Sequence, residues 1–144
     1  MIQRIQTLWL ILAMACAVLL LYFPVWQIFD GGIEGGMDEV GAGKHFFLLP
    51  FAPILFIFHS LAIYSFKNRK RQLNFCNIDI LLFIIYLIAV LAIIQTENQI
   101  FSDFHLGDFR FGALLPIIGI ILNLMAKRGI KKDEELVRSM DRLR

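Results

Sequence analysis

Apolar residues along the chain gather into four long blocks, with no strand-like or amphipathic alternation inside them. The uncharged blocks cover residues 5–29, 46–66, 80–94 and 111–126. A helix needs ~20 mainly apolar residues to cross ~30 Å of hydrocarbon. The first two blocks reach that length, and the other two approach it when they are extended to about 78–94 and 109–126. The pattern predicts an all-α membrane protein, a bundle of four transmembrane helices at about 5–29, 46–66, 78–94 and 109–126.

The two shorter blocks leave an alternative open, because re-entrant or interfacial segments also have this length. Such half-spans would leave backbone polar groups unsatisfied in lipid, so full spans are favoured.

The residues after the fourth block carry a different pattern, which divides the chain into a transmembrane domain (1–128) and a tail (129–144). Acidic residues precede basic ones from about Asp133 to Leu143, which suits the dipole of a helix. Apolar residues recur there on one helical face, namely Leu136, Val137, Met140 and Leu143. We therefore expect a cytoplasmic amphipathic helix at the C-terminus.

Composition agrees with a membrane location. Hydrophobic residues make up 58% of the 144 residues and charged residues 18%, whereas soluble domains are ~45–50% apolar and ~25% charged. The net charge of +2 is an average over two unlike sets of segments. The N-terminus, residues 67–79 and the tail from 127 hold 12 Lys and Arg against 5 Asp and Glu, while residues 30–45 and 95–110 hold 2 against 7. Since basic loops mark the cytoplasmic side, both termini of this multi-pass protein are expected in the cytoplasm.

The basic segments also supply a candidate binding surface for anionic lipid or a protein partner. The residues concerned flank the second and fourth blocks: Lys67, Arg69, Lys70, Arg71, Lys127, Arg128, Lys131, Lys132, Arg138 and Arg142.

Few polar groups fall at membrane depth, where ionisable residues are the default functional candidates. His59 lies in the inner half of the second span and Asp79 at the inner start of the third. Because these helices are adjacent and antiparallel, the two side chains form a candidate His–carboxylate pair, as in a proton relay. The plainer alternative is interhelical hydrogen bonding, or an Asp79 that is solvated at the interface.

We find no catalytic set, metal site or cofactor site in the sequence. The two cysteines, Cys16 and Cys76, form no CxxC pair, and His59 is the one histidine within the spans, so a bis-His haem site lacks its second ligand. The sequence therefore predicts a protein that is not an enzyme, with no metal, no cofactor and no nucleic-acid partner.

Both ends of the chain resemble an uncharacterised family of small four-span bacterial inner-membrane proteins. The resemblance rests on the first ten residues, MIQRIQTLWL, and on the last thirteen, KDEELVRSMDRLR. It implies an inner-membrane location and no site residues, and it draws attention to the cytoplasmic ends.

The leading hypothesis is an accessory or scaffold protein that engages a cytoplasmic partner or anionic lipid through its basic inner face and tail. The competing hypothesis is a subunit of a small-solute or proton-coupled transporter that uses His59 and Asp79. A membrane-embedded enzyme is a weaker third. The expected partners are membrane lipid and a cytoplasmic or membrane protein, and assembly as a homo-oligomer stays open.

Overall fold

The computed structural model describes residues 2–29, 37–43, 45–97 and 110–142. Its elements in chain order are α1 (Ile2–Leu19), β1 (Trp26–Phe29), β2 (Met37–Val40), α2 (Phe51–Tyr64), the 3-10 helix η1 (Ser65–Lys67), α3 (Arg69–Glu97), the 3-10 helix η4 (Phe111–Ala113) and α4 (Leu114–Arg142).

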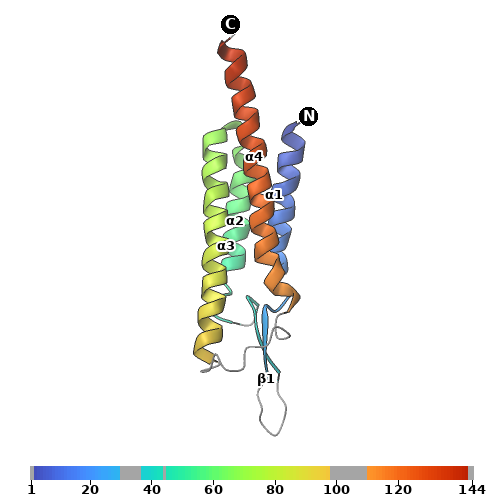
Figure 1. Cartoon of the computed structure of the whole chain (residues 1–144), viewed down its shortest axis with the longest axis vertical. Helices are drawn as coiled ribbons and strands as arrows, with labels where there is room; N and C mark the ends of the chain where they lie inside the picture. Colours follow the sequence, from blue (N-terminus) through green and yellow to red (C-terminus); the bar gives the residue numbers. More distant parts are fainter. Residues whose placement is uncertain (1, 30–36, 44, 98–109, 143–144) are drawn as a thin grey trace.

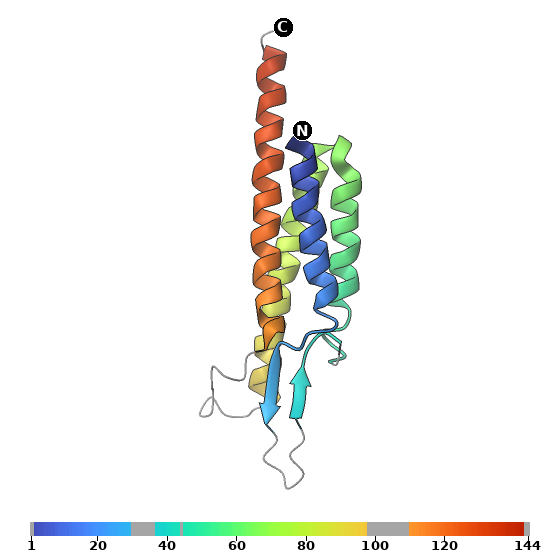
Figure 2. The same cartoon turned by 90° about the vertical axis from the view of Figure 1, so that its right-hand side faces the viewer.

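The four α-helices of the described chain form an up-down-up-down bundle (Figure 1). Each helix packs against its sequence neighbour, and α1 packs against α4 to close the ring. Both termini and the α2–α3 junction lie at one end of the bundle, and the C-terminal part of α4 projects beyond that end (Figure 2).

A small antiparallel sheet lies at the opposite end of the bundle (Figure 1). Strands β1 and β2 pair in the register Trp26↔Val40 to Phe29↔Met37. The 3-10 helix η4, which leads into α4, is tied to the chain before β1, because Arg110 N–H donates to the Val25 carbonyl and Gly112 N–H donates to the Pro24 carbonyl. We call this the hairpin end.

The first predicted span, 5–29, is divided in the structure. Helix α1 ends at Leu19, and residues 26–29 form β1. Turns with hydrogen bonds between residues three apart follow the helix, since Tyr22 N–H donates to the Leu19 carbonyl. Pro24 then disfavours helical geometry at the residue before it. Pairing with β2 turns the end of the apolar block into a strand.

The last two helices are longer than the apolar blocks that predicted them. Helix α3 begins at Arg69, nine residues before the expected start at 78. Asn68 caps it, because its side-chain oxygen accepts a bond from the backbone N–H of Arg71. Helix α4 runs without a break from Leu114 to Arg142, so the expected tail helix is its continuation.

The buried apolar residues form two separate clusters. The hairpin-side cluster includes Leu20, Leu55, Phe83, Tyr86 and Trp26. The second cluster, nearer the termini, consists of Leu10, Ala62, Cys76, Ala126 and Ile130. On α2, α3 and α4 the buried side chains between these clusters are polar, namely His59, Asp79 and Asn123, whereas on α1 the buried residue between them is Ala13.

The outer surface of the bundle is apolar on all four helices. Ile57 of α2, Ile88 of α3 and Ile121 of α4 are each more than half exposed, as is Ile5 of α1. Many neighbouring leucine, isoleucine and phenylalanine side chains are also exposed. A soluble monomer rarely exposes apolar surface on this scale.

Candidate functional site

Six polar side chains are buried in the described residues, namely Gln6, His59, Gln72, Asp79, Asn123 and Asp133. Five of them belong to two groups. We name His59, Asp79 and Asn123 the polar triad, and Gln6, Asp133 and the half-buried Arg69 the end clasp. On α3, Asp79 of the triad lies ten residues after Arg69 of the clasp. On α4, Asn123 of the triad lies ten residues before Asp133 of the clasp. At 1.5 Å per residue, the triad therefore lies about 15 Å deeper in the bundle than the clasp.

Helical periodicity brings the triad together. On α2, His59 shares the buried face with Leu55 and Ala62. On α3, Asp79 lies between the buried residues Cys76 and Phe83. These intervals of three and four residues keep each polar group on the inner face of its helix.

The triad is a continuous line of contacts across three helices. His59 Nδ1 lies 3.2 Å from Asp79 Oδ1 and 2.8 Å from the Leu55 carbonyl oxygen. Asn123 Nδ2 lies 3.1 Å from His59 Nε2 and donates to the Gly119 carbonyl at 3.0 Å. All three side chains of the triad are fully buried.

These contacts define the protonation of His59. The Leu55 carbonyl can only accept a hydrogen bond, so Nδ1 must carry a proton. The amide group of Asn123 is oriented by its bond to Gly119, which places its NH₂ toward Nε2. Nε2 is therefore the acceptor, and His59 is a neutral imidazole with its proton on Nδ1.

Three acceptor atoms of the triad have no hydrogen-bond donor, namely both carboxyl oxygens of Asp79 and Oδ1 of Asn123. The short distance from Asp79 Oδ1 to His59 is a close contact only, because the single Nδ1 proton points to Leu55. Buried polar atoms without a protein partner are uncommon in a native core.

Phe83 and Gly119 close the hairpin side of the triad. The Phe83 ring meets the imidazole of His59 edge-on, with centroids 5.9 Å apart and an interplanar angle of 73°. A Cβ at Gly119 would lie 2.5 Å from the Phe83 ring, so only glycine permits this approach of α3 and α4.

The end clasp is a satisfied polar group. Gln6 Nε2 donates to Asp133 Oδ2 at 2.7 Å, and Arg69 places a guanidinium nitrogen 3.2 Å from the same oxygen. The clasp joins α1, α3 and α4 at the end of the bundle. Sequence reasoning assigned Asp133 to the helix dipole and did not single out Gln6. The missed signal was the spacing of Asn123, Ala126, Ile130 and Asp133, which continues the buried stripe of α4.

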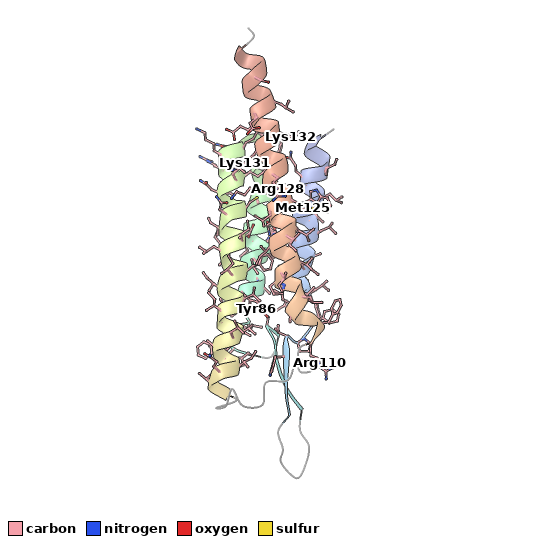
Figure 3. All side chains as sticks on the ribbon, in the orientation of Figure 1. Tyr86, Arg110, Met125, Arg128, Lys131 and Lys132 are labelled. Carbon is pink, nitrogen blue, oxygen red and sulfur yellow. The ribbon has the colours of Figure 1, made fainter. Side chains whose placement is uncertain are left out.

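The predicted basic surface gathers at the end that holds both termini, which we call the basic end. Figure 3 shows Lys131 and Lys132 near this end and Arg110 at the hairpin end. The exposed members are Lys67, Lys70, Arg71, Arg128, Lys131 and Lys132. Lys127 is half-buried, and Arg69 faces Asp133.

Part of the predicted tail surface falls outside the described residues. This holds for Leu143 and for the side chains of Val137, Arg138, Met140 and Arg142. Leu136 is described and is 46% exposed.

The sequence placed His59 and Asp79 as a candidate pair, and the structure brings their side chains into contact. Asn123 completes the site from α4. Among the described residues, no group of three His, Cys, Asp or Glu side chains is arranged to hold a metal. The groups of the triad that can bind a proton are the Asp79 carboxyl group and the His59 imidazole.

Comparison with known proteins finds a family and no individual relative. No curated protein and no solved structure matches the chain. The family described as "Domain of unknown function (DUF4293)" matches residues 2–143. Because this match covers nearly the whole sequence, the chain belongs to that uncharacterised family.

Proposed function

We propose that the protein is a four-span integral protein of the bacterial inner membrane and acts there as an accessory or scaffold protein. The observation that carries this proposal is the reversed polarity of the bundle. Exposed isoleucine, leucine and phenylalanine side chains cover the outside, while histidine, aspartate and asparagine side chains lie inside. Lipid is the environment in which an apolar exterior around a polar interior is stable.

Helix length supports the proposal. Segments Arg69–Thr96 and Phe111–Leu136 are long and apolar enough to cross a membrane, and only 28% and 33% of their most apolar windows are buried. The core helix of a soluble protein would be mostly buried. The shorter apolar helices Ile5–Leu19 and Phe51–Lys67 have 15 and 17 residues, or about 23 and 26 Å. Those lengths approach the ~30 Å of the hydrocarbon core.

The position of the basic residues supports an orientation with both termini in the cytoplasm. The start of α1, the α2–α3 junction and the C-terminal half of α4 meet at the basic end. Three basic segments that are far apart in sequence therefore lie on one side, as the positive-inside rule requires.

The scaffold role rests on the basic end and on α4. Helix α4 extends to Arg142, nine residues beyond the clasp residue Asp133, and projects past the bundle. The exposed lysines and arginines beneath this projection suit the phosphates of anionic lipid. The projecting helix is then held above the membrane surface, where a cytoplasmic partner can reach it.

The orientation is tested by reporter fusions in cells. An enzyme that is active only after export, fused after Arg144, should be inactive, and the same enzyme inserted between Phe29 and Met37 should be active. The opposite pair of results overturns the topology.

The lipid role is tested with charge variants in nanodiscs that contain anionic lipid. Each basic residue near the surface contributes about 1 kcal/mol, or about fivefold in affinity. The double variant Lys131→Gln/Lys132→Gln should lose anionic lipid measured by native mass spectrometry. The control Arg110→Gln removes an exposed charge at the hairpin end and should retain it.

The partner role is tested by truncation after Leu136. This cut keeps Asp133 and the clasp, so the bundle stays intact while most of the projection is lost. A crosslinked cytoplasmic partner that is captured by the full chain should be lost from the truncated chain. Equal capture by both chains argues against the projection as a docking element.

A transporter subunit is the second candidate function, and the contact between His59 and Asp79 favours it. Under this hypothesis His59→Ala and Asp79→Asn abolish cellular function, whereas the scaffold hypothesis expects both variants to be nearly silent.

A further inference from the structure

The triad carries an uncompensated acidic group, which the scaffold role does not use. His59 is held neutral by Leu55 and Asn123, so it offers no positive charge to Asp79. An isolated buried carboxylate is costly, and a proton on the carboxyl group removes that charge.

Among the residues that the structure describes, no lysine or arginine forms an ion pair with Asp79. Residues 5–19 of α1 include no charged side chain. The nearest ionisable group on α3 is the Cys76 thiol, which is fully buried and lies three residues before Asp79. Lys127 itself is half-buried near the basic end.

We propose that Asp79, His59 and Asn123 form a binding site for a single proton, which exchanges with water at the basic end. The proton is taken up from water onto a carboxyl oxygen of Asp79 and is released to water by the same route. His59 keeps its own Nδ1 proton throughout and lies against the carboxyl group as a neutral partner.

Asn123 is the positioning residue of this site. A second proton on His59 would have to occupy Nε2, where the NH₂ group of Asn123 already donates. Turning the amide would accommodate that proton, but it would place the amide oxygen against the Gly119 carbonyl. Asn123 thus disfavours the imidazolium form and directs the proton to Asp79.

The side chains that pack against the triad differ in size between its two sides. Toward the basic end, the buried residues include the small side chains Ala62, Cys76 and Ala126. Toward the hairpin end, Phe83 packs directly on His59, and Tyr86 and Leu55 follow. Leu10 and Ile130 complete the cluster on the side of the basic end. Because the residues next to the triad on α2, α3 and α4 are small on that side, whereas Phe83 covers the other side, exchange is expected from the basic end.

The depth of the site agrees with this assignment. The triad lies about 15 Å from the end clasp, which is half of the ~30 Å hydrocarbon thickness. Placement at mid-membrane depth rests on the proposed membrane location. Binding of a proton by the triad is independent of lipid or partner binding at the basic end, so either proposal can fail alone.

Infrared spectroscopy of the protein in nanodiscs tests the site. The wild-type protein should show a carboxylic-acid C=O band that shifts in D₂O and changes with pH. Asp79→Asn should remove this band, and the matched control Glu135→Gln, at an exposed position of α4, should keep it. Absence of the band from the wild-type protein, or its persistence in Asp79→Asn, overturns the proposal.

A second measurement needs no substitution at Asp79. ¹⁵N NMR of histidine-labelled protein should show His59 as the single neutral Nδ1–H form, and Asn123→Leu should allow the Nε2–H form or the imidazolium. The control Asn77→Leu, at an exposed position of α3, should leave the His59 signals unchanged. An imidazolium in the folded wild-type protein contradicts the role of Asn123.

The route is tested in sealed vesicles that are isolated through a tag after Arg144, so that the C-terminus faces outward. An external pH step should change the Asp79 band at once. A response only to a change of internal pH overturns exchange from the basic end.

Discussion

The end clasp and the polar triad each bury one aspartate in the same bundle, but they treat its carboxyl group in opposite ways. Asp133 receives a hydrogen bond from Gln6 and a guanidinium contact from Arg69. Asp79 has a neutral imidazole at 3.2 Å and no hydrogen-bond donor on either oxygen. The Asp133 side chain is 8% exposed and its partner Arg69 is 23% exposed, whereas the Asp79 side chain is fully buried.

This difference separates a structural polar group from a functional candidate. A buried carboxylate with donors and a positive partner joins helices, and breaking it is costly. A buried carboxyl group without donors adds little to stability and is free to take up a proton. Burial alone therefore does not assign a role to an acidic residue, because the donors around it decide that role.

The largest expected effect is that of Asp133→Ala. The substitution leaves the Arg69 charge and the Gln6 amide without their shared acceptor. We expect a loss of about 3 kcal/mol in the free energy of unfolding, measured in mixed micelles. Glu135→Ala, which removes an exposed acid two residues away, is the control and should change little. Similar losses in both variants would remove the distinction between clasp and surface.

Two glycines of α4 allow the packing beside the triad to be compared with the packing beside the clasp. A Cβ at Gly119 would meet the buried Phe83 ring at 2.5 Å, and one at Gly129 would meet the flexible Gln6 side chain at 2.8 Å. Gly119→Ala should cost about 2 kcal/mol through overpacking. Gly129→Ala should cost less than about 1 kcal/mol, because Gln6 can move and alanine favours the helix. Thermal unfolding in detergent ranks the two variants, and the reverse order would contradict the rigid packing assigned to the triad.

A smaller effect is expected from Arg69→Gln. The glutamine retains a donor for Asp133 but loses the charge, so the expected loss is about 1 kcal/mol. Its exposed neighbour Lys70→Gln should change stability by less than about 0.5 kcal/mol. The clasp lies at the end of the bundle, where salt can screen its charges. High salt should therefore reduce the difference in unfolding free energy between Arg69→Gln and Lys70→Gln. A difference that does not depend on salt argues against an electrostatic clasp.

The sequence predicted the pairing of His59 with Asp79 better than it predicted the ends of the helices. Depth within the apolar blocks, together with the antiparallel neighbours, was enough to pair His59 with Asp79. The hydrogen bond from Asn123 to His59 could not be predicted, because it depends on the rotation of α4 in the bundle. Hydropathy also underestimated the lengths of α3 and α4. Lysine, arginine and glutamate are good helix formers, so they lengthen a helix without adding apolar residues.

The division of residues 5–29 into a helix and a strand was missed for a different reason. The strand depends on pairing with Met37–Val40, which no local pattern reveals. The end clasp was missed because Gln6, Arg69 and Asp133 come from three distant segments. Local signals in this chain thus identify the apolar helical segments, whereas the burial and the partners of single residues depend on the packing of the helices.

The most direct test of the comparison is the same substitution at both aspartates, with the free energy of unfolding measured under identical conditions. Asp133→Asn keeps the shape of the side chain and removes its charge beside Arg69, so it should cost about 1 kcal/mol. Asp79→Asn exchanges one neutral group for another and should change stability by less than about 0.6 kcal/mol. A loss at Asp79 that equals or exceeds the loss at Asp133 would show that Asp79 is an ionised, paired carboxylate and would contradict the account.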